Sequence, residues 1–137
     1  MSSLRYLLFY LICGFLASWS HIASNATSIL PSIGASGAIA GVLGAYIMLY
    51  PRARVWTLIF LGFFVRLMYI PAGIILGYWF LIQVLSGSMA GRQDAGGVAF
   101  WAHIGGFVSG VLLVGLFKKR GVRFFSPPRR QVQPYYD

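Results

Sequence analysis

The amino-acid sequence predicts an all-α protein, a polytopic bundle of about four transmembrane helices. Of its 137 residues, 58% are hydrophobic and only 9% are charged, whereas a typical soluble domain has about 25% charged residues. A soluble domain of about 150 residues still leaves roughly 30% of its unfolded surface in water. This chain has too few charges to cover such a surface, so the lipid bilayer is the expected solvent.

Four apolar segments are candidates for membrane-spanning helices. About 20 helical residues cross a hydrocarbon core about 30 Å thick, and the first segment meets this length. A cleavable signal peptide is the alternative interpretation of that segment, because Arg5 precedes its apolar run. The second segment is shorter and stops before Pro51, so one of its ends is expected below the membrane surface. The four segments are residues 4–23, 36–50, 72–88 and 97–117.

The remaining segments connect or follow these spans. Residues 55–70 are apolar but contain Arg66 and precede Pro71, so we interpret them as an interfacial or partly extended connector. Residues 118–137 are basic and contain prolines, which is typical of a disordered tail. The sequence therefore predicts a membrane domain over residues 1–117, followed by a disordered cytoplasmic tail.

Membrane topology explains the net charge of +9 better than nucleic-acid binding does. No basic stripe is interleaved with stacking aromatic residues. If the chain crosses the membrane four times, every cation except Arg92 lies on one side of it. Cytoplasmic loops of membrane proteins are enriched in Lys and Arg, so this side is expected to be the cytoplasmic one. Both termini are therefore expected in the cytoplasm, and the plasma (inner) membrane is the expected location. The lipid bilayer, and not nucleic acid, is the expected partner.

The sequence offers little for metal or redox chemistry. Cys13 is the single cysteine, and its apolar surroundings in the sequence are typical of a small buried side chain. The two histidines and the two acidic residues, Asp94 and Asp137, are scattered along the chain. We therefore expect no metal site and no cofactor.

The second span opens with a Gly-Ala-Ser-Gly motif that starts at Gly34 and has Ser36 as its serine. Serine is a good helix N-cap, so Ser36 has a purely structural explanation. Small residues at helical spacing also allow another helix to approach closely, which favours a packing role for the motif. These small residues are Gly37, Gly41 and Gly44.

An ionisable side chain inside a membrane span is costly, which makes His103 a candidate functional residue. His103 lies a few residues into segment 97–117, and the shortness of the second span sinks Ser36 to a similar depth. Gly106 and Gly110 share the helical face of His103, so this face can pack against the glycines of the second span. Ser36 and His103 are therefore expected to meet at one helix contact. A histidine bonded to a neighbouring carbonyl is the alternative.

A serine and a neutral imidazole are sufficient for acyl transfer. The hydroxyl is a weak nucleophile until a base removes its proton, and imidazole, with a reference pKa of about 6.5, can accept that proton. A carboxylate as third member is not expected, because Asp94 lies in a predicted loop near Arg92 and Asp137 lies in the tail. The residues therefore favour a dyad of Ser36 and His103.

The motifs at residues 34–37 and 102–106, taken in this order, resemble those of the rhomboid intramembrane serine proteases, and the resemblance extends over residues 4–117. It implies that Ser36 is the nucleophile and His103 the general base. By the same resemblance the protein is a serine-type endopeptidase that cleaves transmembrane segments of membrane proteins near the outer membrane face. The backbone of the serine motif would then hold the oxyanion, at Gly34 and Gly37.

The chain also departs from the pattern of this family. Rhomboids usually have at least six spans, with the serine on the fourth and the histidine on the sixth, so the four predicted spans correspond to the last four. The His and Asn that the second span of the family supplies for the oxyanion have no counterpart, and we interpret the spacing of His21 and Asn25 as coincidence. Ala40 stands where some members have a tyrosine that stacks on the histidine. The alternative function is that of a truncated or inactive rhomboid-like protein that binds membrane clients without proteolysis.

Overall fold

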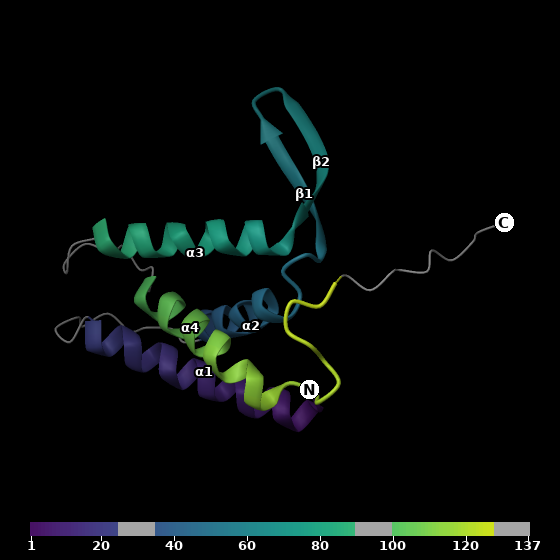
Figure 1. Ribbon diagram of the computed structural model, residues 1–137. Coiled ribbons are helices and arrows are strands. Elements are labelled where there is room, and N and C mark those ends of the chain that lie inside the picture. Colours follow the sequence, from purple (N-terminus) through teal and green to yellow (C-terminus); the bar gives the residue numbers. More distant parts are fainter. Residues whose placement is uncertain (25–34, 90–99, 128–137) are drawn as a thin grey trace.

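The computed structural model describes residues 1–24, 35–89 and 100–127, and it shows four helices with a two-stranded hairpin between the second and the third (Figure 1). Three helices, α1, α2 and α4, pack together, and α3 runs along one side of this group. The elements, in chain order, are α1 (Ser3–Ser24), α2 (Ala35–Leu49), β1 (Arg54–Leu61), β2 (Phe64–Pro71), α3 (Ala72–Met89) and α4 (Phe100–Phe117).

The predicted helical membrane bundle is confirmed. Three of the described helices, α1, α3 and α4, are long and apolar enough to cross a membrane, whereas α2 has only 15 residues. Each helix begins and ends within a few residues of the segment expected from the sequence. Many large apolar side chains point outward, as expected where lipid tails and not water surround the bundle.

Helices α2 and α4 approach so closely that glycine is required at their contact. A Cβ atom on Gly106 would collide with the carbonyl oxygen of Gly37, and one on Gly110 would collide with that of Gly41. A Cβ on Gly44 would likewise collide with the carbonyl oxygen of Phe107. The structure thus brings together the two glycine faces that the sequence spacing placed on the second and fourth spans.

Helix α1 covers the other side of this contact. Its Cys13 is fully buried, and a Cβ on Gly41 would lie 2.7 Å from the Cys13 sulfur. The rings of Phe9 and Phe117 meet edge to face, with centroids 5.6 Å apart, at the N-terminal end of α1 and the C-terminal end of α4. Phe9, Cys13, Ala45 and Val114 form the buried apolar cluster that joins the three helices.

Residues 54–71 are not helical and form an antiparallel hairpin, a pairing that the sequence interpretation of a partly extended connector did not include. The signal was present, because both strands are rich in β-branched and aromatic residues and a two-residue turn separates them. Gly62 has a φ of 63° in that turn, a conformation that glycine adopts without steric cost.

The residues after α4 fold back onto the end of α2. The backbone N–H of Phe125 donates to the carbonyl of Met48 at 3.0 Å, and that of Ser126 donates to the carbonyl of Leu49 at 2.9 Å. The remainder of the predicted tail, residues 128–137, lies outside the described part of the chain. The division into a membrane domain and a disordered tail stays a prediction.

Candidate active site

Ser36 and His103 lie in the first turns of two helices that run side by side. Ser36 is the second residue of α2 and is exposed, and His103 is half-buried near the start of α4. Their chain neighbours are in contact, because a Cβ on Gly37 would lie 3.3 Å from the carbonyl oxygen of Ala102. The two predicted site residues therefore lie at the same end of the glycine contact between α2 and α4.

Within the described residues, no hydrogen bond joins Ser36 to His103. Hydrogen bonds between catalytic groups are often long in unliganded enzymes and tighten only when substrate binds. The arrangement thus supplies a hydroxyl and an imidazole at one end of the bundle, without a preformed bond between them.

The imidazole of His103 is held by Gln83, a residue that the sequence interpretation missed. The Nδ1 atom of His103 lies 2.8 Å from Oε1 of Gln83 on α3. Because an amide oxygen can only accept a hydrogen bond, this partner assigns the ring proton to Nδ1 and leaves the lone pair of Nε2 free. Gln83 is only 8% exposed, and it is the one buried polar side chain in the described part of the chain. A lone amide inside an apolar span was the signal that could have identified it.

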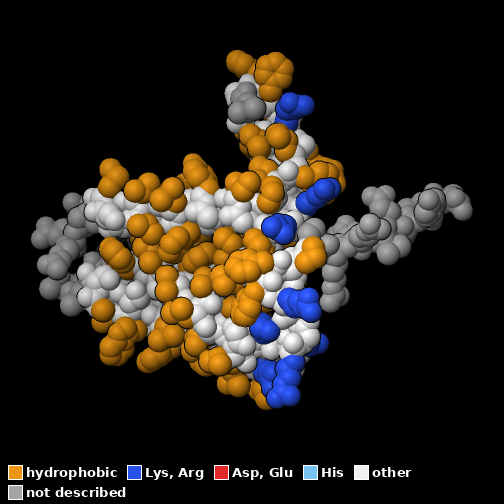
Figure 2. Space-filling model, viewed as in Figure 1, with side chains coloured by type: hydrophobic (Ala, Val, Ile, Leu, Met, Phe, Trp, Pro, Cys, Tyr) orange, Lys and Arg blue, Asp and Glu red, His pale blue; other side chains and the backbone are white. Residues whose placement is uncertain are grey.

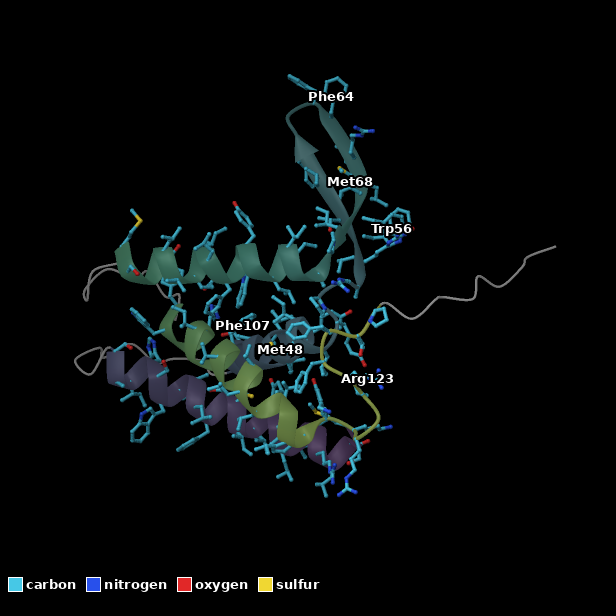
Figure 3. The ribbon with its side chains drawn as sticks, in the orientation of Figure 1. Met48, Trp56, Phe64, Met68, Phe107 and Arg123 are labelled. Carbon is cyan, nitrogen blue, oxygen red and sulfur yellow. The ribbon has the colours of Figure 1, made fainter. Side chains whose placement is uncertain are left out.

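Trp79 lies beside the histidine on the side of α3, and further aromatic side chains pack next to it. The ring centroid of Trp79 lies 5.8 Å from that of His103 and 6.1 Å from that of Phe107. Phe107 points from α4 toward α3 (Figure 3), where it stacks on Phe80 with centroids 4.5 Å apart. Helix α3 therefore limits the positions that the imidazole can take and shields one side of it with apolar surface.

The N-terminus of α2 supplies the groups that could hold an oxyanion. The first N–H groups of a helix have no partner within that helix and point toward its N-terminal end, where the helix dipole favours negative charge. Ser36 and Gly37 both belong to this first turn. Gly34, the other motif glycine, lies outside the described residues.

His21 lies in the last turn of α1 and takes no part in the contact between Gln83 and His103. Its Nδ1 atom is buried and has no hydrogen-bond partner among the described residues. Asn25, its partner in the spacing noted in the sequence, lies outside those residues. The interpretation of this spacing as coincidence stays a prediction.

Among the comparisons with known proteins, a family model matches this chain. The model of the rhomboid domain matches residues 1–120. No curated protein and no solved structure matches the chain. The match covers most of the chain, including all four helices, and it agrees with the bundle of apolar helices described above. The chain therefore belongs to the rhomboid family of membrane proteins.

Proposed function

We propose that this protein is an intramembrane serine endopeptidase in which Ser36 is the nucleophile and His103 the general base. Members of the rhomboid family are generally serine proteases, and the family match covers both residues. The observation that carries the proposal is the common location of Ser36 and His103 at one end of the contact between α2 and α4. The Gln83 contact supports it further, because it leaves Nε2 of the imidazole free to accept a proton.

The proposed reaction has two steps. The Ser36 hydroxyl attacks the scissile carbonyl carbon while Nε2 of His103 takes its proton, and the carbonyl oxygen becomes a negatively charged oxyanion. When the tetrahedral intermediate collapses, the protonated imidazole gives the proton to the leaving amine, and an acyl-enzyme remains. Water, deprotonated by the same imidazole, then releases the carboxylic acid and restores Ser36. Backbone N–H groups in the first turn of α2 stabilise the oxyanion in both steps.

The substrates of the proposed reaction are transmembrane segments of other membrane proteins. The candidate site lies at the end of the bundle opposite to the Lys and Arg side chains of the described residues, which is the outer end if the cationic end faces the cytoplasm. A peptide bond within a helix is protected by its backbone hydrogen bond, so cleavage is expected where the substrate helix ends or unwinds near the membrane surface.

Labelling with a fluorophosphonate probe tests the dyad. We expect the protein in lipid nanodiscs to be labelled at Ser36, because the probe reacts with a serine that a base activates. Labelling should be lost in Ser36→Ala and in His103→Ala. Ser109→Ala is the matched control, since Ser109 lies on α4 but its hydroxyl donates to the carbonyl of Gly105 at 2.6 Å. A folded wild-type protein that remains unlabelled would contradict the proposal.

The second candidate is a rhomboid-like protein that binds transmembrane clients without cutting them. The observation in its favour is that no hydrogen bond joins Ser36 to His103 in the described part of the chain. For this protein we expect a fluorescent transmembrane peptide to bind in nanodiscs and to keep its full mass in mass spectrometry. Cleavage that disappears in Ser36→Ala would exclude this candidate.

A further inference from the structure

The hairpin of β1 and β2 exposes a continuous row of large apolar side chains. The strand register places three cross-strand pairs on one face of the hairpin, and none of the six side chains is charged. All six are between 48% and 69% exposed. The pairs are Trp56 with Tyr69, Leu58 with Leu67, and Phe60 with Val65. A contiguous exposed apolar surface of this kind usually marks a site of interaction with a membrane or a protein.

The hairpin leaves the bundle at the end where the cations gather. Figure 2 shows Lys and Arg side chains along one edge of the molecule, from the hairpin to the opposite side of the bundle. No Asp or Glu occurs among the described residues to neutralise them. Arg52 and Arg54 lie at the base of the hairpin and Arg66 on its second strand; the others are Arg5, Lys118, Lys119, Arg120 and Arg123.

The hairpin extends sideways from the helices. In Figure 1 it points away from the bundle instead of continuing the direction of α3, so it does not follow α3 through the bilayer when α3 crosses it. Its base is fixed by two backbone hydrogen bonds, from the N–H of Ala72 to the carbonyl of Ala53 and from the N–H of Gly73 to the carbonyl of Pro51, both at 2.8 Å. The direction of the hairpin is therefore set by the junction between α2 and α3.

Two physical constraints define where such a hairpin can lie. Exposure of its apolar face to water is unfavourable in free energy. Its strand edges carry backbone N–H and C=O groups with no partner, and these groups are not tolerated in the hydrocarbon core. The interface between headgroups and acyl chains satisfies both constraints. Tryptophan and tyrosine favour this region, and the rings of Trp56 and Tyr69 lie against each other with centroids 4.2 Å apart.

We infer that the hairpin is a membrane-interface anchor that binds anionic lipid in the leaflet at the cationic end of the bundle. The apolar row lies among the upper acyl chains, and Arg52, Arg54 and Arg66 bind the lipid phosphates. Anionic headgroups are the partner that the uncompensated positive charge of this end fits. The anchor does not depend on the proposed peptidase activity, because none of its residues belongs to the candidate active site.

Spin-label accessibility in nanodiscs tests the depth of the hairpin. In a Cys13→Ala background, a label at Leu67→Cys reports the apolar row, Leu112→Cys on the exposed side of α4 is the lipid reference, and Gly121→Cys is the water reference. The measured quantity is the ratio of collisions with a water-soluble nickel chelate to collisions with oxygen. We expect this ratio to be several-fold lower for the label at Leu67 than for the label at Gly121. A Leu67 label as accessible to the chelate as the one at Gly121 would overturn the inference. So would dipolar broadening at Leu67 that vanishes on dilution with unlabelled protein, because a second copy would then cover the row.

Charge variants test the preference for anionic lipid. We expect the Leu67 label to lie deeper in nanodiscs of phosphatidylcholine with phosphatidylglycerol than in phosphatidylcholine alone. This difference should disappear when Arg52, Arg54 and Arg66 are replaced together by Gln. The matched control replaces Lys119, Arg120 and Arg123 by Gln and should keep the difference. An equal loss in both triple variants, with unchanged gel-filtration profiles, would refute binding by the arginines of the hairpin.

Discussion

Gln83 lies within an apolar helix and contacts the imidazole that the proposed mechanism needs. Its side chain is buried against His103, and the contact at 2.8 Å sets the position of the ring proton. Ser36, in contrast, is exposed and is placed by the first turn of its helix. The reactivity of the pair is therefore expected to depend on a third residue that positions the histidine and touches no substrate.

Replacing Gln83 tests this positioning role. Gln83→Leu removes the acceptor and leaves Nδ1 of His103 without its partner. We expect the rate of fluorophosphonate labelling at Ser36 to fall roughly tenfold, which corresponds to about 1.4 kcal/mol, the size of one hydrogen bond. Gln83→Glu keeps an oxygen acceptor and should label faster than Gln83→Leu. Equal labelling rates in wild type and Gln83→Leu would show that Gln83 does not position the base.

At the level of secondary-structure elements, the contact of α2 with α4 is a backbone contact. Carbonyl groups of one helix lie directly on glycines of the other, at Gly106 and Gly110. Such packing replaces the hydrophobic effect as the force that joins helices in a bilayer. It also determines the location of Ser36 relative to His103, because Ser36 directly precedes Gly37 and His103 lies three residues before Gly106.

A single methyl group at the contact should separate the two helices. In Gly106→Ala the new Cβ would collide with the carbonyl oxygen of Gly37, and overpacking of this kind costs about 1–3 kcal/mol. We expect a lower midpoint of thermal unfolding in detergent and weaker probe labelling at Ser36. Gly77→Ala is the matched control on α3, since no atom lies within 4 Å of its added Cβ. The contact would be less tight than described if both variants unfolded at the same temperature.

For the molecule as a whole, the described cations gather at one end of the bundle and the candidate site lies at the other. At the cationic end Met1 and Phe117 both pack against the buried apolar cluster, and the residues after α4 return to the end of α2. An excess of Lys and Arg marks the cytoplasmic side of membrane proteins. We therefore predict that the cationic end faces the cytoplasm and that Ser36 opens toward the other side.

Cysteine accessibility in intact cells tests this orientation. In a Cys13→Ala background, we expect Gly121→Cys to react with a membrane-impermeant maleimide only after the cells are permeabilised. Ala23→Cys, near the end of α1 that lies beside the candidate site, should react in intact cells. The opposite pattern would mean that the bundle has the inverted orientation. Reaction of both residues in intact cells would contradict three membrane crossings, by α2, α3 and α4, between Ala23 and Gly121.

Several features of this protein follow from local properties of its chain. The thickness of the bilayer limits the length of an apolar helix, so the helices could be located from runs of apolar residues and from Pro51. Glycines at helical spacing indicated which faces of α2 and α4 meet, and the motifs around Ser36 and His103 indicated their family. Each of these signals is contained within one segment.

Other features depend on contacts between segments and were decided only in the folded molecule. Gln83 and His103 are 20 residues apart, and their hydrogen bond exists because α3 packs beside α4. The hairpin of β1 and β2 had a local signal in its strand-forming residues and its turn, but its direction relative to the helices is set by the junction with α3. In a bilayer, an apolar side chain meets a similarly apolar environment whether it faces lipid or another helix. Composition and spacing alone therefore could not show that α3 packs beside α4.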